Sequence, residues 1–225
     1  MPRVSRSGPN ANNLLKNKAF TPGELFVNKF VDSYFEDLHV ALENVQYTGP
    51  QGERLNRAEA YERTLKLAQE ATGRGGKLMF IGNGGSAGIA SHMAIDFTKN
   101  GQMPAMCFND GAALTCMGND FGYEEVFARQ LHFHAHKGDV LFAISSSGAS
   151  ENILRAVAVA RDRGCVVITM SGFKADNPLR ALGDVNFYLG LSEYGMVEVA
   201  HTAMIHAVVD LKLANSLVEG ARIQE

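Results

Sequence analysis

Short continuous hydrophobic runs alternate along most of the chain with longer segments in which hydrophobic residues recur three and four positions apart. A continuous run bounded by small or polar residues is typical of a buried strand, and the wider spacing is typical of an amphipathic helix. Strands that alternate with helices predict an α/β fold with three layers, in which helices flank a parallel sheet on both faces. The predicted strands are residues 78–81, 105–108, 140–144, 166–170 and 185–189.

Two further helices are predicted ahead of the first strand. The first begins at Pro22, and the second runs from about Arg57 to Thr72, after a break at residues 47–56. The hydrophobic stripe of the first helix lies outside the α/β unit and needs a cover, so we expect these N-terminal helices to pack in an oligomer. That stripe consists of Leu25, Phe26, Phe30, Val31, Phe35, Leu38 and Leu42.

The composition divides the chain into a tail and one domain. Residues 1–20 are rich in Asn, Ser, Lys and Arg, which is typical of a flexible segment. Residues 21–225 are expected to form a single domain, because a chain of 225 residues that is 46% hydrophobic can bury one full core. Within it we distinguish an N-terminal helical region, 21–74, and an α/β core, 75–217.

Charge, cysteine content and the length of the hydrophobic runs exclude several classes of protein. A formal net charge of -3 without a long basic run argues against nucleic acid as a ligand. No run is long enough to cross a bilayer, and the N-terminus lacks the apolar core of a signal peptide. The three cysteines have no metal-ligand spacing and are expected to be reduced thiols. We therefore expect a cytoplasmic protein without a membrane or nucleic-acid partner.

Candidate chemistry begins at the first predicted strand, where the sequence reads LMFIGNGGSAGIASHMAIDF. A glycine-rich turn that leads into a helix suits a phosphate, because glycine lets the backbone approach a ligand and the helix start presents unpaired N–H groups. His92 and Asp96 are four residues apart on one face of that helix. Tight packing at the turn and an ordinary surface ion pair are the structural alternatives. The G-x-G-x-x-A spacing, with Asp110 further on, also keeps a dinucleotide site open.

A second strand-to-helix turn reads SSSGAS, at residues 145–150. Its hydroxyls, together with the amides at the start of the following helix, can surround one phosphate without an arginine. The structural alternative is that Ser150 caps the helix and the other serines form a turn. A dinucleotide-binding protein needs one pyrophosphate turn and has no use for four clustered serines, so we expect no nucleotide cofactor.

Four blocks, in their order and spacing, carry a resemblance to a known family. The chain is similar to the sugar isomerase (SIS) domain family and, within it, to the phosphoheptose isomerases, which interconvert sedoheptulose 7-phosphate and D-glycero-D-manno-heptose 7-phosphate. The resemblance covers roughly residues 78–217 and implies a SIS fold, a sugar phosphate substrate and a homotetramer with sites shared between subunits. The blocks are GNGGSAGIASH, GNDFGY, AISSSGAS and the final helix with His206.

The resemblance also implies roles for individual residues. Asp96 falls where the family has its catalytic glutamate, and His206 falls on its catalytic histidine; we expect them to serve the carbon proton and the carbonyl oxygen of an enediol reaction. Many members bind zinc, at positions that are here His92, Asp96, Glu198 and His206. The implied substrate-binding residues are Asn83, Gly84 and Gly85 for the sugar, Asn119 and Asp120 for its hydroxyls, Ser145, Ser146, Ser147 and Ser150 for the phosphate, and Glu198.

This sequence departs from the family's pattern at four positions. Asp96 is one methylene shorter than the family's glutamate, and Glu198 replaces a glutamine. Gly195 and Asn100 stand where an aspartate and an arginine are usual. A different sugar or altered handling of the same one therefore stays open, as does the alternative of a non-catalytic SIS protein that senses a sugar phosphate or binds a partner protein, as adaptors of a replication initiator do.

Other histidines are further candidates for metal ligands. His201 lies three residues from Glu198 and is a substitute ligand, although we favour a surface or interface histidine at that position. His132, His134 and His136 fall near the end of a predicted helix, where alternate residues point to different sides. We expect no metal at those three residues.

Overall fold

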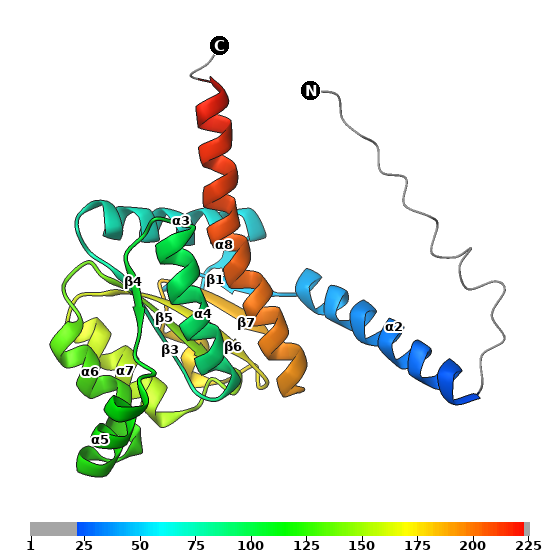
Figure 1. Cartoon of the computed structure of the whole chain (residues 1–225), viewed down its shortest axis with the longest axis horizontal. Helices are drawn as coiled ribbons and strands as arrows, with labels where there is room; N and C mark the ends of the chain where they lie inside the picture. The colour runs from blue at the N-terminus through cyan, green and yellow to red at the C-terminus, as the bar shows by residue number, and fades with distance from the viewer. Residues whose placement is uncertain (1–21, 223–225) are drawn as a thin grey trace. The chain divides into compact units, whose positions relative to one another are not determined.

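The chain folds around a seven-stranded mixed sheet in a computed structural model that describes residues 22–222, with the side chains of residues 22–217 (Figure 1). The strand order is β2-β1-β7-β6-β5-β3-β4, and β3 to β7 run parallel. The predicted parallel α/β sheet is confirmed, and the predicted tail at residues 1–20 lies outside the described residues. The parallel strands are β3 (Leu78–Gly82), β4 (Ala105–Cys107), β5 (Val140–Ser145), β6 (Val166–Gly172) and β7 (Val185–Leu189).

Helices cover both faces of the sheet (Figure 1). On one face α4 and α8 lie side by side, and α3 packs against α8; α6 and α7 pack together on the other face. No helix of the described part of the chain combines the length and apolar character needed to cross a membrane. The helices of the α/β body are α3 (Arg57–Gly73), α4 (Gly85–Lys99), α5 (Gly111–Phe121), α6 (Val126–His134), α7 (Glu151–Asp162) and α8 (Tyr194–Arg222), with short 3-10 turns η1 (Tyr123–Glu125) and η2 (Pro178–Ala181).

The two faces divide the core because successive side chains of a strand point to opposite sides. Phe80 of β3 stacks on Phe142 of β5 with ring centroids 4.7 Å apart, and Phe97 of α4 packs against both rings. The alternate residues Met79 and Ile81 belong to the cluster formed with α6 and α7. All five strand residues of β3 are buried, so the central strands are covered on both sides.

The segment that we expected only to break the chain at residues 47–56 contains two antiparallel strands. β1 (Gln46–Thr48) pairs with both β2 (Arg54–Leu55) and β7, so the sheet is not wholly parallel. Strands of three and two residues are too short to produce a recognisable alternation in the sequence. Their pairing is therefore set by the neighbouring strand and by the side chains that bridge to it.

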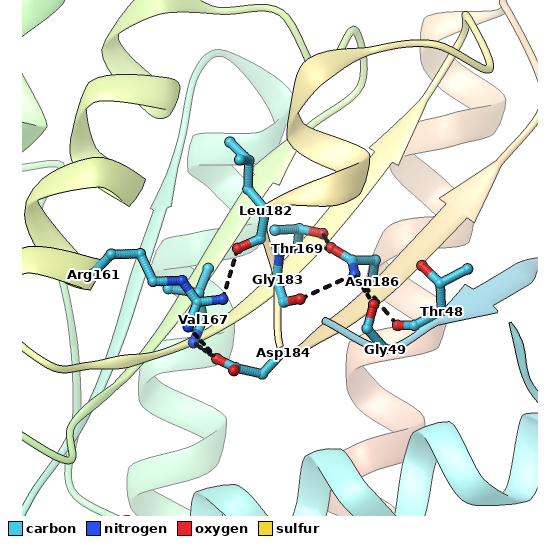
Figure 2. A network of polar contacts seen from close by, with 9 residues as sticks. All are labelled: Thr48, Gly49, Arg161, Val167, Thr169, Leu182, Gly183, Asp184 and Asn186. Atoms are coloured by element: carbon cyan, nitrogen blue, oxygen red, sulfur yellow. Dashed lines mark hydrogen bonds and ion pairs between the residues drawn. The ribbon is translucent and has the colours of Figure 1, made fainter. Parts of the chain in front are cut away.

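Asn186 of β7 is the centre of that bridge (Figure 2). Its Oδ1 accepts hydrogen bonds from the Thr169 hydroxyl and the Gly183 amide, each at 2.7 Å, and its Nδ2 donates to the Gly183 and Gly49 carbonyls at 3.1 and 3.3 Å. The side chain is 1% exposed, and a buried amide has to satisfy both its donor and its acceptor. Asn186 thus ties the end of β1 to β6 and to the turn before β7.

The boundary of α5 lies within the GNDFGY block, at residues 118–123. This block has the composition of a polar turn, but α5 continues through Asn119 and Asp120 and ends at Phe121. Gly118 is tolerated inside the helix, whereas Gly122, with φ of 90°, adopts the conformation that ends it. A glycine in a sequence therefore marks a helix end only where its backbone adopts a conformation, such as a positive φ, that other residues rarely adopt.

The helix α2 (Pro22–Glu43) confirms the helix predicted from Pro22. The described residues up to Val40 form one compact unit, and those from Ala41 onward form another. The first unit exposes a run of large hydrophobic side chains along α2, at Leu25, Phe26, Val27, Phe30, Val31, Phe35 and Val40.

Candidate active site

Two strand-to-helix turns meet at the carboxyl ends of neighbouring parallel strands, β3 and β5. Between them lies a cavity of about 220 Å³, which we call the serine cavity. Ligands of open α/β sheets bind at this edge, because there the strand ends and helix starts present backbone groups together. The cavity is lined by Asn83, Gly84, Gly85, Ser86, Ser145, Ser146, Ser147, Ser150, Tyr194 and Glu198.

The first helix start, at α4, is open because it is built from glycine. Gly84 is the N-cap residue with φ of 54°, and no side chain caps the amides that follow. A Cβ atom on Gly85 would lie 2.3 Å from the carboxylate of Glu198, so a larger residue would fit there only if the end of the Glu198 side chain moved. The carboxylate of Glu198 therefore rests against the amino end of α4, on the wall of the serine cavity.

The second helix start, at α7, leaves its serine hydroxyls available. Ser150 is the N-cap residue, but its side chain makes no capping hydrogen bond. The Ser146 hydroxyl is buried and has no hydrogen-bond partner among the described residues. Ser145 and Ser147 accept hydrogen bonds from the amides of Gly148 and Ala149, and their hydroxyl protons are not used in these bonds. An anion with several oxygens would satisfy these donors.

A second group, which we call the histidine–aspartate cluster, lies further along α4 and α8. Oδ2 of Asp96 is 3.5 Å from Nε2 of His92 on the same helix and 3.5 Å from Nδ1 of His206 on α8. The other carboxylate oxygen accepts a hydrogen bond from Asn100 Nδ2 at 3.3 Å. The Asp96 side chain is 16% exposed, against 58% for His92 and 34% for His206, so the carboxylate is shielded while both imidazoles meet solvent.

The donor set of this cluster suits a metal ion. One ligand atom from each of His92, Asp96 and His206 lies within 4.8 Å of the others, and two imidazoles with a carboxylate are a common zinc set. Glu198 is not part of this group and instead faces Gly85. Within the described residues, His132, His134 and His136 form no such cluster.

The cavity and the cluster lie on the same pair of helices. Both α4 and α8 start at the carboxyl edge of the sheet, after β3 and β7, and they pack side by side (Figure 1). Gly85 meets Glu198 near the start of the pair, and Asp96 meets His206 further along. From Glu198 to His206 is a helical rise of about 12 Å. An extended seven-carbon sugar phosphate has a length of the same order.

A family model described as SIS domain matches residues 50–172. The phosphoheptose isomerase of Helicobacter hepaticus is 37% identical over 158 residues, which are 68% of this chain and 80% of that protein. The chain belongs to the SIS domain family.

Solved structures agree with this assignment of the SIS domain. The phosphoheptose isomerase GmhA from Neisseria gonorrhoeae matches with a TM-score of 0.72 and 29% identity over 83% of this chain and 99% of that chain. A phosphoheptose isomerase from Francisella tularensis matches with a TM-score of 0.68 over 85% of this chain and 98% of that chain, and at 24% identity it supports the fold alone.

Not every candidate residue of this SIS domain lies at the serine cavity. Asn119 and Asp120 are exposed at the end of α5, where Asn119 Nδ2 donates to Asp120 Oδ1 at 2.9 Å, and they are not among the residues that line the cavity. His201 is completely buried, so the expectation of a surface or interface histidine is wrong within the protomer itself. Its Nε2 lies 3.4 Å from the Ser171 carbonyl oxygen, and burial lowers its pKa to about 4.

Sequence reasoning missed Asn152, which joins the two turns. Asn83 Nδ2 donates to Asn152 Oδ1, and Asn152 Nδ2 donates back to Asn83 Oδ1, both at 2.9 Å. Tyr123, from GNDFGY, donates its hydroxyl to the same Asn83 oxygen at 3.0 Å. A signal was present in the sequence, because Asn152 is the one polar position on the otherwise apolar buried face of α7.

Proposed function

We propose that this SIS protein is a ketose–aldose isomerase that converts sedoheptulose 7-phosphate to D-glycero-D-manno-heptose 7-phosphate, or acts on a closely related sugar phosphate. The observation that carries the proposal is the contact between Asp96 and His206, on the same helix pair as the serine cavity. An acid and a base beside an anion cavity are what an isomerase needs, and a protein that only binds a sugar phosphate needs neither. The relatives named phosphoheptose isomerase support the same reading.

The serine cavity would hold the phosphate. Its donors are backbone amides at two uncapped helix starts and the hydroxyls of Ser145, Ser146, Ser147 and Ser150. Such neutral donors in fixed positions bind an anion without a counter-charge. They also hold the sugar in one position relative to the histidine–aspartate cluster. The reactive carbons would then lie toward the histidine–aspartate cluster.

The cluster would carry out the proton transfers. Asp96 takes the proton from C1 of the open-chain ketose while His206 donates a proton to the carbonyl oxygen at C2, which gives the enediol. In the second half, His206 removes the proton from the C1 hydroxyl and Asp96 returns a proton to C2, which gives the aldose. Protons balance over the cycle, and Asn100 would hold Asp96 in place through its second oxygen.

His92, Asp96 and His206 would also hold a zinc ion. When bound, zinc would supply Lewis-acid polarisation of the sugar oxygens. Glu198 would complete the implied ligand set only by turning away from Gly85. The protein's own contribution is then to fix the orientation of the two imidazoles about the Asp96 carboxylate.

We infer that the active form is a cytoplasmic homotetramer. The exposed hydrophobic side chains along α2 support association, because monomeric proteins rarely leave such a contiguous run uncovered. The sharing of sites between subunits is part of the same proposal. Gel filtration with light scattering would test it, and a monomer at micromolar concentration would contradict it.

The test of the function is product formation by the full-length protein. Purified protein is incubated with sedoheptulose 7-phosphate, with and without a chelator, and the new aldose is measured by NMR. We expect aldose in the untreated sample, and a lower rate after chelation if zinc is required. The isosteric variant Asp96→Asn is the matched control and should form the aldose about a thousandfold more slowly. A substrate that raises the melting temperature but is never converted would contradict catalysis and favour the sensor or adaptor.

A further inference from the structure

Three separate segments of the chain meet at one amide group. Asn83 lies in the turn after β3, Asn152 in the first turn of α7, and Tyr123 in η1. The two asparagines exchange a reciprocal pair of hydrogen bonds at 2.9 Å, and the Tyr123 hydroxyl adds a third at 3.0 Å. These segments are the glycine turn, the helix that follows the serine turn, and the GNDFGY block.

The hydrogen-bonding capacity of Asn83 is largely used by this arrangement. Its Oδ1 accepts two hydrogen bonds, one from Asn152 and one from Tyr123, which fills both lone pairs of an amide oxygen. Its Nδ2 donates one proton to Asn152 and has one left. Asn83 lines the serine cavity, yet its carbonyl oxygen is occupied by the protein rather than offered to a sugar.

Among the described residues, Asn152 makes its side-chain hydrogen bonds to Asn83. Its side chain is 2% exposed and does not line the serine cavity. Both of its side-chain hydrogen bonds go to Asn83, and the neighbouring buried positions of α7 are Ile153, Ala156 and Val157. A polar group on an apolar face is costly unless it is fully paired, so the pair fixes both side chains in one orientation.

The position of the pair connects the two ends of the serine cavity. Asn152 lies two residues after Ser150, the N-cap of α7, and Asn83 lies directly before Gly84, the N-cap of α4. A phosphate that settles on the start of α7 therefore acts on the glycine turn through two hydrogen bonds. The glycine turn leads directly into α4, which carries His92 and Asp96.

We propose that Asn152 is a positioning residue that couples the phosphate-binding serine turn to the sugar-binding glycine turn through Asn83. This inference rests on the proposed function for the identity of the substrate. In this arrangement, the binding energy of the remote phosphate orients the turn that contacts the sugar. Enzymes commonly use contacts far from the reacting atoms to orient the reacting part of a substrate. Tyr123 supports the same oxygen from its exposed position, with 63% of the residue accessible.

The test compares two dissociation constants in the full-length protein, both measured by calorimetry. Inorganic phosphate reports the phosphate position alone, and sedoheptulose 7-phosphate reports that position together with the contacts of the sugar at the glycine turn. For Asn152→Leu we expect the sugar phosphate to bind at least tenfold more weakly, while the constant for inorganic phosphate changes less than threefold. The affinity of Asn152→Asp for the sugar phosphate should lie between those of wild type and Asn152→Leu, because the carboxylate accepts a hydrogen bond from Asn83 Nδ2 but cannot donate one to Asn83 Oδ1.

Tyr123→Phe keeps the test decisive if a substitution at the buried position impairs folding. It removes one hydrogen bond that an exposed residue makes. We expect the affinity for the sugar phosphate to fall about threefold, while the dissociation constant of inorganic phosphate stays unchanged. If Asn152→Leu lowered the affinities for the sugar phosphate and for inorganic phosphate equally, Asn152 would only shape the serine turn. If the melting temperature fell while both dissociation constants stayed unchanged, its role would be structural. Either result would overturn the proposal. These constants need no turnover, so an inactive wild type that binds sugar phosphate would refute isomerase activity but not the coupling.

Discussion

The serine cavity and the histidine–aspartate cluster share the helices α4 and α8, to which the cavity adds the turn before α7, and they are built in different ways. The cavity consists of backbone amides and small hydroxyls at strand ends, and the sheet fixes their positions. The cluster consists of long side chains on helix faces, two of them well exposed, with Asn100 as the hydrogen-bonding neighbour of the carboxylate. The comparison suggests that the cavity determines where the ligand binds, and that the cluster determines what happens to it.

Removal of the carboxylate charge at the cluster should have the largest effect. Asp96→Asn keeps the shape and the contact with Asn100 but cannot accept a carbon proton, so we expect kcat to fall about a thousandfold, in the range for loss of an acid–base group. KM and the melting temperature should change little, because the serine cavity is untouched. Steady-state kinetics and thermal unfolding measure these quantities. A variant that keeps more than a tenth of wild-type kcat would contradict the role of Asp96.

Burial of His201 in α8 should make the stability of the protein depend on pH. Burial holds the pKa of His201 near 4 in the folded state, below its ordinary value of 6.5, so the unfolded chain takes up a proton first. Its contribution to stability is complete above pH 6.5 and is lost as the pH falls from 6.5 toward 4, by about 3 kcal/mol at 1.36 kcal/mol per pKa unit. Denaturant unfolding of wild type and His201→Gln across this range isolates the effect. Parallel curves for the two proteins would contradict it.

Removal of a hydroxyl at the cavity should weaken binding rather than chemistry. Ser146→Ala removes a buried donor that has no partner among the described residues, so stability should not fall. A hydrogen bond to a charged group is worth about 1.5–3 kcal/mol, so we expect KM to rise about tenfold or more with kcat nearly unchanged. Ser147→Ala, which also removes a contact with the Ala149 amide, is the matched control. A fall in kcat at constant KM would place Ser146 with the reacting groups.

The smallest effect is expected at Glu198, where a carboxylate borders the serine cavity. Glu198→Gln removes a negative charge beside the proposed phosphate site, so KM should fall about fivefold at low ionic strength, and the difference should narrow as salt is added. Kinetics at two salt concentrations test both parts. A rise in KM would show instead that the carboxylate accepts hydrogen bonds from the sugar.

Much of the fold could be predicted from hydrophobic patterning, because buried parallel strands are continuous apolar runs. The strand at residues 185–189 was predicted with its observed bounds. The strands β1 and β2 were missed because two or three residues carry no period, and their pairing depends on Asn186, which is distant in sequence. Burial of His201 likewise results from packing against β6 rather than from its own helix.

The candidate site was predictable to the extent that it is local in sequence. Glycine and serine clusters at strand ends indicated an anion cavity, since these residues have few other reasons to gather there. The contact of Asp96 with His206 joins helices over a hundred residues apart, and only the family resemblance brought them together. Asn152 and Asn100 were missed as supporting residues because a side chain that orients another side chain leaves no motif.

The most direct test of the isomerase mechanism follows the carbon-bound proton itself. Wild type and Asp96→Asn are incubated with sedoheptulose 7-phosphate in deuterated water, and deuterium at C1 and C2 is measured by NMR. We expect wild type to incorporate deuterium while it forms the aldose, and Asp96→Asn to bind the sugar phosphate with unchanged affinity but to incorporate deuterium about a thousandfold more slowly. Equal incorporation by both proteins, or none by wild type that binds the substrate, would contradict the mechanism.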